Sequence, residues 1–119
     1  MRTFKSAWFA KAAKKAYITD RVLCFVIAQV NLGQADDLGG GVFKKRLNKN
    51  ELRAIILSKT QSFWIYEYVF AKKDRDNIDE AELKDFRLLV KSYTALTAKQ
   101  IDTLLSEKDW VEICKETTP

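Results

Sequence analysis

Three extended apolar runs between Val42 and Ala71 constrain the fold most, because only short connectors separate them. The runs cover residues 42–47, 51–57 and 62–71, and the third is dense in aromatic and β-branched residues, which favour strands. A parallel crossover needs about a dozen residues or more, so strands joined by such short connectors pair antiparallel. The segment therefore predicts an antiparallel meander with turns at residues 48–50 and 59–61.

Basic side chains lie at the ends and along one side of these predicted strands. We expect them to gather on one edge or face of the sheet as a phosphate-sized cluster of positive charge, made of Lys44, Lys45, Arg46, Arg53, Lys72, Lys73 and Arg75. A net charge of +5 agrees with a polyanionic partner, most simply nucleic acid. Ordinary solvated lysines explain the charge equally well, so charge alone does not decide.

The third run predicts a central strand with bulky residues on both faces. Strict alternation puts Glu67 on the same face as Phe63, Ile65, Val69 and Ala71. It puts Tyr68 on the other face, with Trp64, Tyr66 and Phe70. Glu67 in this setting predicts an ion pair with Arg53 or a lysine, in preference to a catalytic base.

Helical periodicity precedes the meander. A first helix begins after Ser6, and a second begins at Thr19 or Asp20 and ends at Gly33, with Ser, Thr and Asp suited to the N-cap. We expect this helical hairpin to cover one sheet face, with residues 2–5 as a short edge strand before it. The lysines of the first helix form either a solvated face or an extension of the cationic surface along an RNA backbone; they are Lys11, Lys14 and Lys15.

Helical periodicity also follows the meander. Asp79 with Glu82 and Thr97 with Gln100 have the spacing of capping boxes, each followed by apolar residues at helical intervals. Residues 109–115 form a small strand or a docked tail. The order of elements predicts an α+β fold: an N-terminal helical hairpin packed on a small antiparallel sheet, with C-terminal helices, in a single domain over residues 1–119.

Several classes of site and location are disfavoured by the sequence. The chain contains no histidine, and Cys24 and Cys114 lie far apart without a CxxC motif, so we interpret both as reduced core thiols of a cytoplasmic protein and expect no metal or cofactor. No apolar run is long enough to span a membrane, and the N-terminus lacks the order of a secretory signal. The glycine segment 39–41 is not a P-loop, and we expect it to be a flexible connection to the first long strand.

Several strings are shared with a known family. They include MRTFK and WFAK at the N-terminus, Leu23-Cys24, DLGGGVFKKR at residues 37–46 and FAKKDRDNI at residues 70–78. In colinear order over most of the chain, they resemble the RelE/ParE-type toxins of bacterial toxin–antitoxin modules, specifically the HigB-like branch. The resemblance implies a small α+β fold, ribosome-dependent mRNA cleavage and inhibition by an antitoxin; it leaves open whether the chain forms a homo-oligomer.

The resemblance also implies a mechanism in which the RNA 2′-hydroxyl attacks its own phosphate. Without histidine, proton transfer falls to lysine, arginine, tyrosine or a carboxylate, and cations stabilise the phosphorane. We expect catalytic roles for Arg53, Arg46, Lys72 and Arg75. We expect RNA binding by Lys44, Lys45, Lys73, Lys11, Lys14 and Lys15.

One departure from the family pattern concerns the connector before Arg53. Members of the branch carry a longer Gly/Lys/Ser-rich loop that ends in an aromatic residue and arginine, whereas this chain has a short connector and Leu52 before Arg53. The short connector therefore gives one alternative, a catalytically weakened or inactive protein that binds nucleic acid or antitoxin. A further alternative, placed last, is a ParE-type gyrase inhibitor, which shares the fold but would damage DNA instead of arresting translation.

Overall fold

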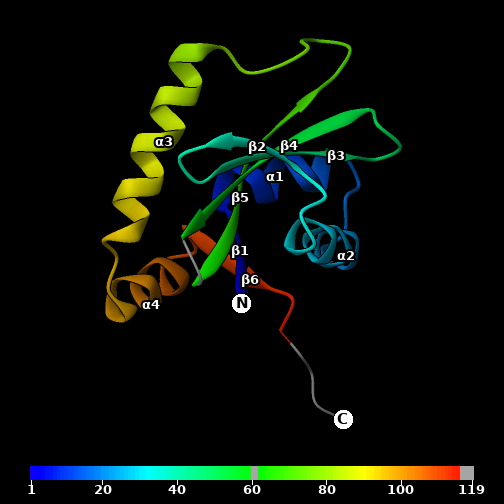
Figure 1. The fold of residues 1–119 in the computed structure, drawn as a ribbon. Helices are drawn as coiled ribbons and strands as arrows, with labels where there is room; N and C mark the ends of the chain where they lie inside the picture. The colour runs from blue at the N-terminus through cyan, green and yellow to red at the C-terminus, as the bar shows by residue number, and fades with distance from the viewer. Residues whose placement is uncertain (60–61, 116–119) are drawn as a thin grey trace.

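A computed structural model describes residues 1–59 and 62–115 of the chain (Figure 1). Its elements in chain order are β1 (Arg2–Ser6), α1 (Ala7–Lys15), α2 (Asp20–Asn31), β2 (Asp36–Gly39), β3 (Val42–Leu47), β4 (Leu52–Lys59), β5 (Phe63–Ala71), α3 (Glu80–Thr94), α4 (Ala98–Ser106) and β6 (Trp110–Ile113). The predicted α+β fold is confirmed. Of the predicted turn at residues 59–61, residues 60 and 61 lie outside the described residues.

The six strands form one sheet in the order β2-β3-β4-β5-β1-β6. The predicted antiparallel meander is confirmed as β3–β4–β5, and β5 is central. β1 is not an edge strand as expected, because it lies parallel to β5 on one side and antiparallel to β6 on the other. β6 confirms the small strand predicted near the C-terminus, whereas β2 is a strand that the sequence pattern did not predict.

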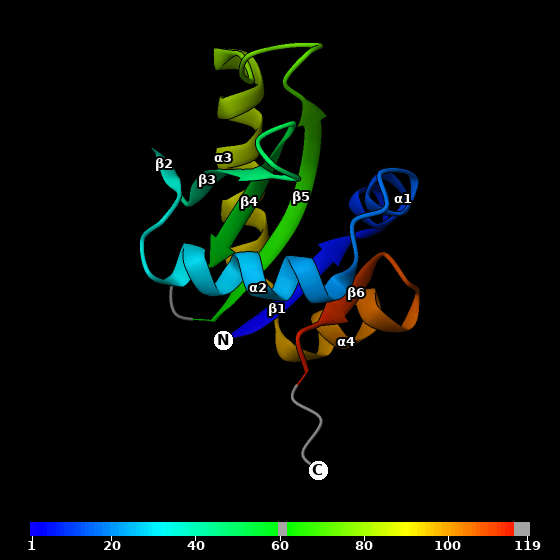
Figure 2. The ribbon, with the colours of Figure 1, turned by 90° about the vertical axis from the view of Figure 1, so that its right-hand side faces the viewer.

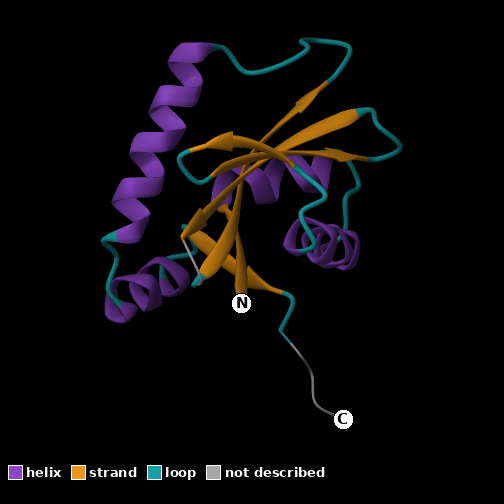
Figure 3. Ribbon diagram, viewed as in Figure 1, coloured by secondary structure: helices purple, strands orange, loops and turns teal. Residues whose placement is uncertain are grey.

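Helices cover both faces of the sheet (Figures 1 and 3). We call the side that α1 and α2 cover the hairpin face; its core joins Leu23, Val26, Ile27 and Val30 of α2 to Trp64 and Tyr66 of β5. We call the opposite side the α3 face; there α3 and α4 pack on a core that includes Phe4, Ile55, Ile65, Val90, Ile101 and Trp110. Figure 2 shows α2 lying across the sheet with α3 behind it. The predicted covering of one face by the hairpin is confirmed.

A β-bulge at Glu67 changes the alternation predicted for β5. Ile55 pairs with Tyr68 and Ile56 pairs with Tyr66, so Glu67 is the extra residue. After the bulge, Tyr68 and Phe70 lie on the α3 face with Phe63 and Ile65. The prediction that Tyr68 and Phe70 share a face with Trp64 and Tyr66 is therefore wrong, because one inserted residue moves the following side chains to the opposite face.

The glycine segment is a tight hairpin turn between β2 and β3, not the flexible connection that we expected. All three glycines have positive φ, at 85°, 65° and 84°. Arg87 of α3 lies over this turn and donates hydrogen bonds from Nη2 to the Leu38 carbonyl and from Nε to the Gly39 carbonyl. A Cβ at Gly40 would lie 2.7 Å from Cγ of Arg87, so the close approach of α3 requires glycine there.

Gly41→Ala should destabilise the protein more than Gly33→Ala, although both glycines have φ of +84°. A Cβ at Gly41 would lie 2.8 Å from Cγ1 of Val90 and 2.9 Å from the Ser58 carbonyl oxygen, whereas nothing lies within 4 Å of one at Gly33. Gly33→Ala should cost about 1 kcal/mol for the left-handed backbone alone, and Gly41→Ala about 1–3 kcal/mol more for overpacking. Urea unfolding of both variants measures the difference, and equal costs would contradict the packing described for Gly41.

A disulfide between Cys24 and Cys114 replaces the reduced thiols that we expected. It joins α2 to the residue that follows β6, across 90 residues of sequence. The prediction was wrong because the two positions are distant in the chain but adjacent in the fold, with a Cα–Cα distance of 5.4 Å. None of the helices in residues 1–59 and 62–115 is long and apolar enough to cross a membrane.

Candidate functional site

Two arginines face each other across β3 and β4. The register pairs Arg46 with Arg53 and Lys44 with Ile55, and alternation places all three cations on the α3 face. Like charges directly opposite one another destabilise a sheet. Lys44 lies 3.9 Å from Asp36 Oδ2, but neither arginine forms an ion pair within the described part of the chain. This arginine pair has an uncompensated positive charge that could bind an anion.

Arg53 is the more buried member of the pair, with 8% of its surface exposed. Its Nη1 donates to the carbonyl oxygens of Asn50, at 2.9 Å, and Leu52, at 3.2 Å. These contacts hold the β3–β4 turn, where Asn48, Lys49 and Asn50 all have positive φ, between 50° and 74°. Left-handed backbone is unfavourable in residues other than glycine. Arg53 therefore stabilises the short β3–β4 turn.

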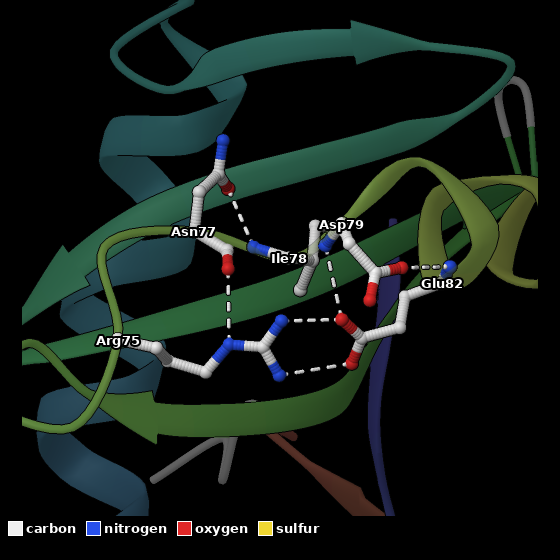
Figure 4. A network of polar contacts seen from close by, with 5 residues as sticks. All are labelled: Arg75, Asn77, Ile78, Asp79 and Glu82. Carbon is white, nitrogen blue, oxygen red and sulfur yellow. Dashed lines mark hydrogen bonds and ion pairs between the residues drawn. The ribbon is translucent and has the colours of Figure 1, made fainter.

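Arg75 is part of a polar network at the start of α3 (Figure 4). Its guanidinium pairs with both carboxylate oxygens of Glu82, and its Nε donates to the Asn77 carbonyl at 2.9 Å. Glu82 completes a capping box with Asp79 at the helix N-terminus. The hydrogen bond between the two side chains raises the pKa of Arg75 and lowers that of Glu82. Arg75 therefore stabilises the segment that leads into α3. Its guanidinium carbon also lies 5.5 Å from the centroid of the Phe70 ring.

The other predicted cations do not all reach the α3 face. Lys45 lies on the hairpin face and donates to the Gln34 carbonyl at 2.6 Å. Lys72 and Lys73 border an open hollow of about 790 Å³ at the end of the sheet, together with Ala16, Leu52, Ala71 and the turn residues 48–51. The seven cations divide between the two sides of the sheet, because neighbouring strand residues alternate. The single cluster that we predicted is only partly formed.

The lysines of α1 are all exposed. Lys14 and Lys15 are in the last turn of the helix, and the next residue, Ala16, lines the hollow that Lys72 and Lys73 border. Lys11 lies further from this end of the helix. The structure therefore brings the end of α1 to Lys72 and Lys73, but it does not place the α1 lysines beside the arginine pair.

Glu67, at the bulge, has a different partner from the cation that we predicted. Its Oε2 accepts a hydrogen bond of 3.0 Å from the Tyr93 hydroxyl of α3, and it forms no ion pair within the described residues. Burial raises the pKa of Glu67, and the Tyr93 hydrogen bond partly opposes that rise. Burial is also the main reason that the pKa of Tyr93 is raised. The structure thus holds a half-buried carboxyl that loses solvation without gaining a cation.

Glu67→Gln should increase the free energy of unfolding at neutral pH. Because the folded protein has the higher Glu67 pKa, this group favours folding below its ordinary pKa and loses that contribution as the pH rises through the folded pKa. Gln avoids the burial of a charge and can still accept the Tyr93 hydrogen bond. Denaturation from pH 4 to 8 should show the variant's advantage growing with pH; a wild-type protein that is more stable at neutral pH would contradict it.

An exposed aromatic stack is a feature that sequence periodicity did not reveal. Trp8, in the first turn of α1, stacks on Tyr68 with ring centroids 4.9 Å apart. The bulge at Glu67 places Tyr68 on the α3 face, so Trp8 contacts a residue of that face although α1 covers the hairpin face. No three His, Cys, Asp or Glu side chains come together as a metal site within residues 1–59 and 62–115.

Comparison with known proteins gives one family. The sequence model described as "RelE toxin of RelE / RelB toxin-antitoxin system" matches residues 1–113. That range runs from β1 to the end of β6 and contains the arginine pair, the hollow and the α3 network. No curated protein and no solved structure matches the chain.

Proposed function

Because the chain belongs to the RelE toxin family of type II toxin–antitoxin systems, we propose that it is a metal-independent endoribonuclease. In this proposal it cleaves mRNA on the ribosome, inhibits translation in the cytoplasm and is neutralised by a cognate antitoxin. Family membership confirms the resemblance found in the sequence. Assignment to the HigB-like branch is part of the proposal.

The observation that carries the proposal is the Arg46–Arg53 pair. Two arginines directly opposite each other on neighbouring strands destabilise a sheet unless an anion balances their charge, and the planar guanidinium matches the geometry of a phosphate. In the transition state the attacked phosphate gains charge, so fixed cations stabilise it more than they stabilise the substrate. We assign this role to Arg46 and Arg53.

The remaining cations have three different roles in the proposal: catalysis, positioning and RNA binding. Lys72 is exposed near the arginine-bearing end of the sheet and can supply charge or a proton to the leaving 5′-oxygen. Arg75 is already paired with Glu82, so we assign it a positioning role through Phe70 and the start of α3. We assign contacts with the RNA backbone, on the two sides of the sheet, to the remaining lysines: Lys44, Lys45, Lys73, Lys11, Lys14 and Lys15.

The mechanism needs one proton acceptor and one proton donor. As the 2′-oxygen bonds to phosphorus, its proton passes to a base and the bond to the 5′-oxygen breaks; that oxygen takes a proton, leaving a cyclic phosphate and a 5′-hydroxyl. With no histidine in the chain, lysine, arginine, tyrosine and the carboxylates are the available groups.

The test is expression of the chain in bacteria, together with translation and cleavage assays on purified ribosomes. We expect growth arrest, mRNA fragments ending in cyclic phosphate and 5′-hydroxyl groups, and rescue by the antitoxin. An unaffected culture and intact mRNA would contradict the nuclease proposal.

A catalytically weakened binding protein is the second candidate, and the β3–β4 turn favours it. Arg53 is nearly buried and its Nη1 is engaged by the turn, which limits how far the guanidinium can reach toward a phosphate. This candidate predicts salt-sensitive RNA or antitoxin binding without cleaved ends.

A further inference from the structure

Trp8 differs from the other tryptophans in exposure. It has 51% of its surface exposed, whereas Trp64 and Trp110 have 7% and 3%. One face of the Trp8 indole is covered by Tyr68, with an interplanar angle of 28°. About half of the residue's surface is exposed despite this contact, so part of the indole remains accessible to solvent.

Packing of α1 does not require this exposed indole. The next residue, Phe9, is fully buried and contacts Tyr66 in the core of the hairpin face, with ring centroids 5.0 Å apart. Ala13, one turn later, is also buried there. Phe9 and Ala13 therefore anchor the helix to the core, whereas Trp8 contacts Tyr68 of β5.

The Trp8 stack leads along β5 toward the arginines. The Tyr68 ring lies 6.0 Å from the ring of Phe70, and the guanidinium of Arg75 lies over Phe70. Phe70 is also the cross-strand partner of Arg53. Aromatic rings on the α3 face thus connect the exposed indole to the proposed phosphate site.

This combination of groups matches single-stranded RNA. Every base has a π face that can stack on an aromatic side chain, and nearby cations neutralise the backbone between bases. A base inside a duplex is already stacked on both sides, so it cannot use such a platform. Stacking tolerates any base, which suits recognition without a fixed sequence.

We propose that the exposed part of the Trp8 indole, supported by Tyr68, stacks a base of single-stranded RNA next to the phosphate bound by Arg46 and Arg53. The proposal rests on the proposed RNA-cleaving function and adds a positioning residue to it. Trp8 would fix the register of the RNA and take no part in proton transfer.

The experiment measures binding of a short single-stranded RNA in which every 2′-hydroxyl is methylated, so that no cleavage occurs. Fluorescence anisotropy of the labelled RNA gives its affinity for the wild type and for Trp8→Ala, Trp8→Phe and Phe25→Ala. Phe25 is a matched control, because it is an aromatic residue with 68% exposure on α2. Thermal unfolding checks that each variant is folded.

We expect Trp8→Ala to bind about 5- to 150-fold more weakly, the range for loss of one stacked base. The salt dependence of binding should keep its slope, because no phosphate contact is removed. Trp8→Phe should retain most of the affinity and Phe25→Ala all of it. In the wild type, RNA should quench tryptophan fluorescence, since Trp8 is the exposed indole.

Wild-type affinity in folded Trp8→Ala, or an equal loss in Phe25→Ala, would overturn the stacking proposal. Cleavage of unmethylated mRNA on ribosomes is measured separately. A wild type that cleaves mRNA while Trp8→Ala binds RNA normally would refute the stacking alone; a wild type that neither binds nor cleaves RNA would refute the proposed function as well.

Discussion

Reduction of the Cys24–Cys114 disulfide should lower the free energy of unfolding by about 4 kcal/mol. The bond closes a loop across 90 residues, and the loss of chain entropy in the unfolded state grows with the length of the closed loop. It also holds β6, an edge strand, against α2 through the residue after Ile113. We expect unfolding of the reduced protein at a lower urea concentration, with β6 protected least from hydrogen exchange.

The matched control for reduction is the double variant Cys24→Ser with Cys114→Ser. Its stability should be close to that of the reduced wild type and should not change when dithiothreitol is added. Mass spectrometry after alkylation checks the thiol state of each sample. Equal urea midpoints for oxidised and reduced wild-type protein would contradict the stabilising role of the bond.

The disulfide also bears on where the toxin acts. Cytoplasmic reductants keep most protein thiols reduced. In the cytoplasmic function that we propose, the protein would work in its less stable dithiol form, and oxidation would strengthen the attachment of α2 to the C-terminal strand. The interpretation of Cys24 and Cys114 as reduced thiols was wrong because their spacing in the sequence does not show that the two residues are adjacent in the fold.

Local patterns predicted the elements that depend on local physics. The capping boxes at Asp79 and Thr97 and the N-caps Ser6 and Thr19 are all formed, because a cap is decided by residues within one helical turn. The meander followed from connector length. Neither inference needed any knowledge of tertiary contacts.

The errors have tertiary causes. A single inserted residue, Glu67, exchanged the faces of Tyr68 and Phe70, and a bulge leaves no mark in a pattern of apolar residues on both faces. The role of Gly39–Gly41 depends on Arg87, which follows much later in the chain. The predicted cation cluster was divided because Lys45 alternates with Lys44 and Arg46 along β3. Candidate site residues could thus be named from sequence, but their division between two faces could not.

Arg53→Ala should reduce mRNA cleavage by about 100-fold or more, the usual effect of removing one group that stabilises developing charge in a transition state. The predicted effect is large because Arg53 lies on the central strand of the meander and is nearly buried, so its side chain is held in a fixed position. Arg21→Ala is the matched control: Arg21 is an exposed arginine on α2, and its loss should leave cleavage unchanged.

A structural effect of Arg53→Ala must be separated from a catalytic one, because Arg53 also donates to the Asn50 and Leu52 carbonyls. Loss of those hydrogen bonds should cost about 1–3 kcal/mol of stability, which urea unfolding measures. Arg53→Lys keeps the charge but lacks the planar guanidinium, so it should recover part of the cleavage rate if charge at the phosphate dominates. If folded Arg53→Ala cleaves mRNA at nearly the wild-type rate, Arg53 serves the turn alone, and the phosphate site must be sought among Arg46, Lys72 and Lys73.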